Sequence, residues 1–87
     1  MHESSLVAGL IGRLEALSRE QGSARIVSVK VRLGALSHIS AEHFRGHFDQ
    51  AARGTVAEGA SLDVEALTDI RDASAQDVVL ESVEVET

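Results

Sequence analysis

The chain has 87 residues, a net charge of −6, 44% hydrophobic residues and no cysteine or proline. This length supports one domain with a modest core, and because Phe44 and Phe48 are its only Phe, Tyr or Trp residues, that core must be aliphatic. The absence of cysteine excludes disulfides and thiolate zinc ligands, the acidic balance argues against nucleic acid as a partner, and no apolar run is long enough to cross a membrane.

The first three residues, Met1-His2-Glu3, form a candidate metal-binding motif. The amine of Met1, the backbone nitrogen of His2 and the imidazole of His2 can all reach one ion. Glu3 offers a further backbone nitrogen or a carboxylate. A planar set of nitrogen donors suits Ni(II) or Cu(II), whereas a solvated end without a role is the alternative. No signal-peptide pattern is present, so we expect a cytoplasmic protein.

Hydrophobic residues at intervals of three and four predict a first helix from Ser4 to about Gln21. Ser4 or Ser5 can cap its start, and Gly22 is placed to end it. Its apolar stripe consists of Leu6, Val7, Leu10, Ile11, Leu14 and Leu17.

Alternation predicts a half-buried strand over Ile26–Leu33. The residues expected on its inner face are Val27, Val29, Val31 and Leu33, and those on its outer face are Ser28, Lys30 and Arg32. A loop over residues 34–39 follows, and Ser40 then caps a second helix that runs to about Arg53, before Gly54. The expected inner positions of this helix are Phe44, Phe48 and Ala51 or Ala52.

Two further strands complete the pattern. The second strand is expected from Ser61 to Leu67, with Leu62, Val64 and Ala66 inward. A polar loop from Thr68 to Asp77 leads to the last strand, Val78 to Glu86, with Val79, Val83 and Val85 inward. Glu81 interrupts that alternation, which predicts a bulge near Glu81-Ser82.

The charges of the strands predict their order. The first strand carries Lys30 and Arg32, and the other two carry acids, namely Asp63, Glu65, Glu84 and Glu86. Because opposite charges on neighbouring strands stabilise a sheet and like charges destabilise it, the basic strand belongs in the middle. We therefore predict an α+β fold, a two-layer sandwich with element order α-β-α-β-β. Its two helices pack on one face of a three-stranded mixed sheet of strand order 2-1-3.

Taken together, these segments resemble the nickel-binding domain of the HypA/HybF family, metallochaperones for [NiFe] hydrogenase maturation. The segments that carry the resemblance are Met1-His2-Glu3, the run from Val29 to Ser37, Phe44 with Phe48, residues 54–60 and residues 80–86. Their order and spacing match over nearly the whole chain. The resemblance implies a single HypA-like nickel-binding domain over residues 1–87.

The resemblance also implies a metal site. His2 is the expected nickel ligand, with backbone nitrogens around it and Glu3 in a supporting role. The family normally inserts a zinc-binding domain with two CxxC pairs between the second and last strands, but this chain has only a short loop at about 68–77, so we expect Ni(II) and no zinc. Some relatives place an acidic ligand before the second helix. Ser40 stands nearby here, and His38 is a candidate substitute.

The function that the resemblance implies is delivery of Ni(II) during [NiFe] hydrogenase maturation, with a HypB-type GTPase and the hydrogenase large subunit as partners. No nucleotide-binding motif or nucleophile set is recognisable, as expected for a carrier rather than an enzyme. The missing zinc domain leaves an alternative, a metal-independent adaptor of this fold that assembles hydrogenase maturation factors. Either one chain or two could hold each ion, so a homodimer stays open.

A pair of histidines on the second helix is a separate observation. His43 and His47 are four residues apart, which puts them on one face of the helix. Such a pair can hold a metal ion. From the sequence alone, an exposed polar flank beside Phe44 and Phe48 is the favoured interpretation.

Overall fold

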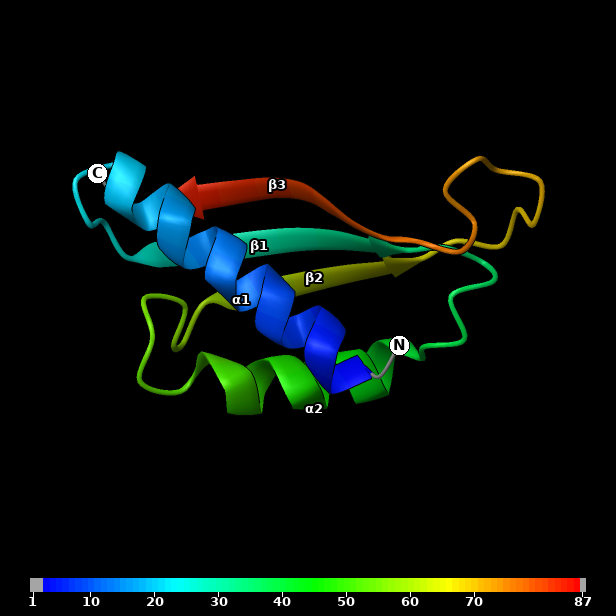
Figure 1. Cartoon of the computed structure of the whole chain (residues 1–87), viewed down its shortest axis with the longest axis horizontal. Coiled ribbons are helices and arrows are strands. Elements are labelled where there is room, and N and C mark those ends of the chain that lie inside the picture. The colour runs from blue at the N-terminus through cyan, green and yellow to red at the C-terminus, as the bar shows by residue number, and fades with distance from the viewer. Residues whose placement is uncertain (1–2, 87) are drawn as a thin grey trace.

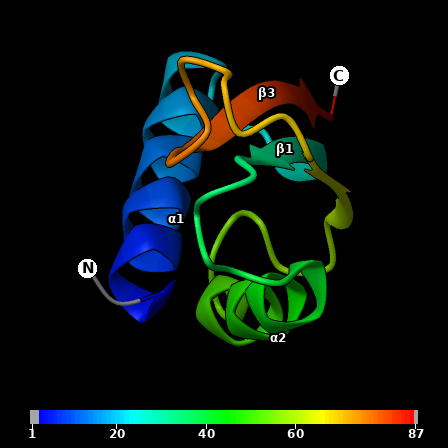
Figure 2. The same cartoon turned by 90° about the vertical axis from the view of Figure 1, so that its right-hand side faces the viewer.

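The structure, a computed structural model, describes the backbone of residues 3–86 and the side chains of residues 5–86. Five elements follow one another: α1 (Glu3–Glu20), β1 (Ile26–Leu33), α2 (Ala41–Ala52), β2 (Ser61–Ala66) and β3 (Val78–Val85). The strands form one sheet of order β2-β1-β3, and both helices lie on the same side of it (Figures 1 and 2). The β1–β2 pair is parallel and the β1–β3 pair is antiparallel. The predicted fold class and strand order are confirmed.

The ends of the helices follow local backbone chemistry. α1 begins at Glu3, so neither Ser4 nor Ser5 precedes it, and the predicted serine cap is wrong. After α1, Gly22 takes the left-handed conformation with φ of 75°, which glycine adopts without a Cβ penalty. For α2 the prediction holds: the Ser40 hydroxyl accepts the backbone N–H of His43 at 3.1 Å.

The core lies between the sheet and the helices and is mostly aliphatic, as predicted. Phe44 and Phe48 of α2 are each 1% exposed and contribute its only aromatic rings. The other buried core residues are Val7, Leu10, Ile11, Leu14, Ile26, Val29, Val31, Leu33, Ala52, Ala57 and Leu62. Ala66, the last residue of β2, is exposed rather than inward.

The two edges of β1 pair differently. Along β2 the register runs without interruption from Ser28–Ser61 to Leu33–Ala66. Along β3 it shifts twice, between Ile26 and Ser28 and between Lys30 and Val31. The second shift leaves Glu81 as the extra residue, so the predicted bulge is confirmed. The first shift, at Val27, had no signal in the alternation.

Both bulges change which side chains point inward. A bulge adds one residue and so reverses the alternation on one side of it. Val27 is 47% exposed while Ile26 is buried at 3%, and Val79 is 37% exposed while Leu80 packs against the core. The sequence-based placement of Val27 and Val79 on the inner face is therefore wrong.

Charged pairs across the outer face of the sheet agree with the predicted strand order. The Arg32 guanidinium donates to both carboxylate oxygens of Glu81, at 2.9 and 2.8 Å, and its Nε lies 3.6 Å from a carboxylate oxygen of Glu65. Lys30 Nζ lies 3.8 Å from Glu81. The basic strand thus lies between two acidic ones, although the partner on β3 is the bulge residue Glu81 rather than Glu84 or Glu86.

The loop between β2 and β3 is folded against the end of β1. Gly34 N–H donates to the carbonyl of Asp77 at 2.8 Å, and Leu36 N–H donates to the carbonyl of Ala75 at 2.6 Å. Ala75 is buried at 4%. A Cβ on Gly34 would overlap the Ala75 carbonyl, so the close approach of the two backbones requires glycine there.

Candidate functional site

The predicted nickel-binding motif is only partly within the described residues. Met1 and His2 lie outside them. Glu3 is the first residue of α1. The first N–H groups of a helix have no acceptor within the helix, so the backbone nitrogen of Glu3 is not occupied by the helix itself.

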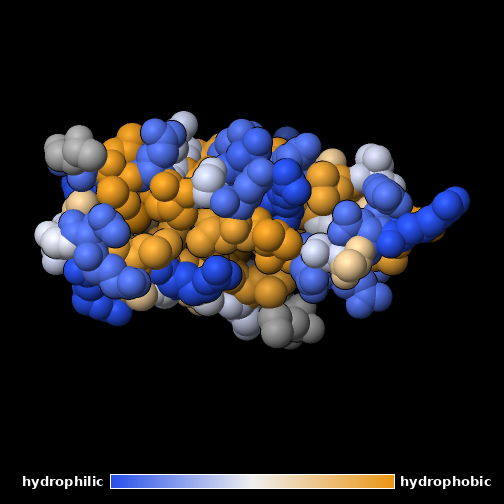
Figure 3. All heavy atoms as spheres, turned by 90° about the horizontal axis from the view of Figure 1, so that it is seen from above, coloured by the Kyte–Doolittle hydropathy of each residue, from blue (hydrophilic) through white to orange (hydrophobic). Residues whose placement is uncertain are grey.

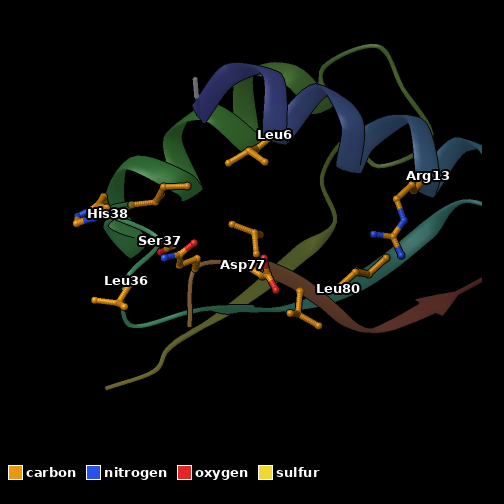
Figure 4. Close-up of a pocket in the computed structure, with 11 residues that line it drawn as sticks. Leu6, Arg13, Leu36, Ser37, His38, Asp77 and Leu80 are labelled. Atoms are coloured by element: carbon orange, nitrogen blue, oxygen red, sulfur yellow. The ribbon is translucent and has the colours of Figure 1, made fainter. Parts of the chain in front are cut away.

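The start of α1 lies beside an open groove. This groove has a volume of about 900 Å³ and runs between α1, the loop after β1 and the beginning of β3 (Figure 4). Leu6, which lines it, is one helical turn beyond Glu3. The full lining consists of Leu6, Arg13, Leu36, Ser37, His38, Ile39, Gln76, Asp77, Val78, Val79 and Leu80.

Much of the groove lining is apolar and incompletely covered. Leu6 and Leu80 are only partly buried, and Val79 is 37% exposed. The hydrophobic residues form a band along the middle of this side of the molecule, with hydrophilic residues on both sides of it (Figure 3). Sequence reasoning did not find this groove. Leu36 and Ile39, apolar residues within a predicted loop, were the available signal.

His38, the candidate substitute ligand, lies at one end of the groove. It has a positive φ of 60°, which is uncommon for a residue other than glycine. Its side chain is exposed, and in Figure 4 it extends away from Leu6 and from the interior of the groove. Among the described residues, no three His, Cys, Asp or Glu side chains form a group that could hold a metal ion. His38 therefore has no second and third ligand within that part of the chain.

His43 and His47 lie on α2, on the flank between the core and solvent. His43 is exposed and His47 is half-buried. Together with Glu42, Gly46 and Gln50 they line a shallow hollow. Their placement agrees with the predicted shared face.

The described residues include no helix that is both long enough and sufficiently apolar to cross a lipid bilayer. A family model described as "Hydrogenase/urease nickel incorporation, metallochaperone, hypA" matches residues 1–84. The chain therefore belongs to the HypA family.

Curated relatives agree with this assignment. The chain is 43% identical over 65 residues to the hydrogenase maturation factor HypA of Methylocella silvestris, a match that covers 75% of this chain and 58% of that protein. It is 42% identical over 64 residues to the HypA of Acidithiobacillus ferrooxidans, covering 74% and 57%. The matched segment thus spans less than two thirds of these relatives.

A solved structure shows the same fold. The solution structure of the Ni metallochaperone HypA from Helicobacter pylori superimposes with a TM-score of 0.81 at 20% identity, covering 98% of this chain and 97% of that one. At this identity the similarity establishes the architecture, including two helices on a mixed sheet of order 2-1-3.

Proposed function

We propose that this chain is a nickel carrier that holds Ni(II) at Met1-His2-Glu3 and delivers it during [NiFe] hydrogenase maturation. One observation carries the proposal: the family match extends from residue 1 to residue 84 and so includes the histidine in second place. Imidazole and backbone nitrogens are suitable ligands for Ni(II). The proposed role is binding and release of cargo, without catalysis.

The helix start influences which form of the site is favoured. α1 begins at Glu3, so the proposed ligands immediately precede, or belong to, the first residue of a regular helix. A helix N-terminus carries a partial positive charge that favours anions. A deprotonated backbone nitrogen bound to Ni(II) is anionic, and the helix would therefore favour the amide-bound form of the site.

The proposed metal is Ni(II) alone. The chain has no cysteine, so a cysteine-based zinc site of the kind described for the family cannot form within it. His38 is a proposed additional ligand of lower rank, because its side chain extends away from the groove (Figure 4). The proposed partners are a HypB-type GTPase, which would supply the nucleotide-dependent step, and the large subunit of the hydrogenase.

Calorimetric titration of tag-free protein with Ni(II) tests this proposal. His2→Ala should abolish the N-terminal binding event, while the urea midpoint of unfolding stays unchanged because the substitution precedes α1. Affinity should rise with pH, since metal ions compete with protons for imidazole and amide nitrogens. His38→Gln should weaken binding only slightly, as expected for a ligand of lower rank, and Glu20→Gln at the other end of α1 is the control that should leave binding unchanged. Retained stoichiometric binding in His2→Ala that also lacks His43 and His47 would refute the proposal.

The open groove favours a second candidate, the metal-independent adaptor that assembles maturation factors. An adaptor needs a surface rather than an ion, and the groove offers exposed apolar residues such as Val79. The two candidates differ in one cellular measurement. In cells that depend on this chain for hydrogenase activity, His2→Ala should eliminate activity if the chain is a carrier, and should leave it intact if the chain is an adaptor.

A further inference from the structure

We propose that His43 and His47 form a second metal site, which takes one late first-row divalent cation such as Ni(II) through two imidazole nitrogens. The site is separate from Met1-His2-Glu3. Its ability to bind metal does not depend on the proposed function.

The spacing of the two histidines provides the chelating geometry. Residues four apart on a helix have Cβ atoms about 5–6 Å apart, and both imidazoles can then turn towards one ion. Both residues lie within α2, which is regular from Ala41 to Ala52. Gly46 lies next to His47 and has no side chain, and a Cβ built there would meet nothing within 4 Å. Gly46 therefore adds no side chain beside the pair.

The roll of α2 about its axis fixes the direction in which the pair faces. Phe44 and Phe48, each 1% exposed, hold one face of the helix in the core. On one flank, Arg45 donates to the carbonyl of Leu62 in β2 at 2.6 Å. His43 and His47 occupy the opposite flank, because they precede the phenylalanines by one position and Arg45 follows Phe44. Phe44, Phe48 and Arg45 thus fix the side of α2 on which the pair lies.

The surroundings of the pair favour a cation. Glu42 and Gln50 line the same hollow of about 330 Å³, so a carboxylate contributes negative charge there without forming a third ligand. The only basic side chain on α2, Arg45, is bonded on the other flank. The chain as a whole carries a charge of −6. Imidazole suits Ni, Cu and Zn ions, and water can complete the coordination shell of an ion held by two protein ligands.

The position of the pair suggests a use for it. His47 shares a small cavity with Val7, Gln50 and Ala51, so it lies against the first turns of α1. Val7 is about one helical turn beyond Glu3. The pair is therefore near the N-terminal end of α1, which follows the predicted N-terminal ligands. It would serve as a second binding site for the ion that these ligands hold. This use, unlike metal binding itself, rests on the proposed function.

The test is Ni(II) titration of the full chain in a His2→Ala background, which removes the N-terminal site. Two readouts are combined: calorimetry for stoichiometry, and NMR for the position of the ion. Ni(II) held by two imidazoles and water is paramagnetic, whereas square-planar Ni(II) is diamagnetic. We expect one equivalent to bind and to broaden the amide signals of Phe44, Gly46 and His47.

Single variants define the ligands. His43→Gln or His47→Gln should each weaken binding about tenfold or more, because the second imidazole binds intramolecularly at high effective concentration. Asp49→Asn, on an exposed side chain of the same helix that does not line the hollow, is the matched control and should leave binding unchanged. Because His43 is exposed, its variant keeps the test valid even if His47→Gln destabilises the fold. No binding in the His2→Ala background, or binding unaffected by His43→Gln, would overturn the second site without affecting the N-terminal proposal.

Discussion

β1 has one neighbouring strand on each side, but the two sides are packed very differently. On the β2 side the register is continuous and α2 closes the layer with Phe44 and Phe48, each 1% exposed. On the β3 side the register shifts twice, and α1 leaves a groove of about 900 Å³ above the beginning of the strand. Regular pairing coincides with a sealed core, and irregular pairing coincides with an open surface.

This difference suggests that the β2 side of β1 mainly stabilises the fold, whereas the β3 side mainly serves the proposed function. The closed side contains both phenylalanines of the core, each 1% exposed. The open side adjoins the start of α1, where the proposed nickel ligands are attached. A substitution on the closed side should therefore change the free energy of unfolding, and one on the open side should change it much less.

The largest effect is expected for Phe48→Ala. Removal of a fully buried phenylalanine costs about 3–5 kcal/mol, a large part of the roughly 5–15 kcal/mol that stabilises a typical domain. The matched substitution on the open side is Leu80→Ala, whose side chain is only partly buried and should cost less than half as much. Urea unfolding followed by circular dichroism measures both. Equal losses would contradict the proposed difference between the two sides.

The next effect is expected for Gly34→Ala at the boundary between strand and groove. The added Cβ would overlap the carbonyl of Ala75, and such overpacking costs about 1–3 kcal/mol. The loop carrying Asp77 should also separate from β1. Hydrogen exchange at Gly34 and Leu36 should become faster, since their N–H groups donate to that loop. Gly12→Ala in α1, where a Cβ meets nothing within 4 Å, is the control that should not destabilise.

A third comparison tests the bulge at Val27. Val29→Thr places a hydroxyl in the core, where Val29 is 1% exposed, and should cost about 1–3 kcal/mol. Val27→Thr, on the side chain that is 47% exposed, should stay within about 0.5 kcal/mol. The two variants make the same chemical change two residues apart. If Val27→Thr proved the more costly, the assignment of faces along β1 would be wrong.

The smallest effect is expected on the outer face of the sheet. Glu81→Gln removes the carboxylate that accepts two hydrogen bonds from Arg32. Exposed ion pairs contribute about 0.2–1 kcal/mol, and the difference between variant and parent should shrink as salt increases. Glu86→Gln, beyond the end of β3, is the control. A loss of stability that does not depend on salt would indicate a packing role for Glu81 instead.

The sequence predicted the elements, the strand order and the fold class because each depended on local or pairwise signals. Apolar periodicity marked both helices, and Lys30 and Arg32 indicated a central strand. The bulge at Glu81 was also predicted, since a charge broke the alternation there. The bulge at Val27 was not, because a valine fits either face and leaves no break in the pattern.

The candidate site was less predictable than the fold. The groove depends on how far α1 extends over β3, which is a property of packing rather than of any segment. The close backbone approach of Gly34 and Ala75 joins residues far apart in the chain and has no local sequence pattern. His43 and His47 were recognised as a pair, but their position on the flank opposite Arg45 and the cavity that His47 shares with Val7 required the structure.

The most direct test of nickel carriage is absorption spectroscopy of the tag-free protein during Ni(II) titration. Coordination by the amine, the amide nitrogens and the imidazole of residues 1–3 would give a d–d band in the range that makes square-planar Ni(II) yellow. We predict that this band saturates at one equivalent, disappears in His2→Ala and persists when His43 and His47 are replaced by Gln. A band that survives in His2→Ala, or a wild-type protein that never develops it, would contradict the account.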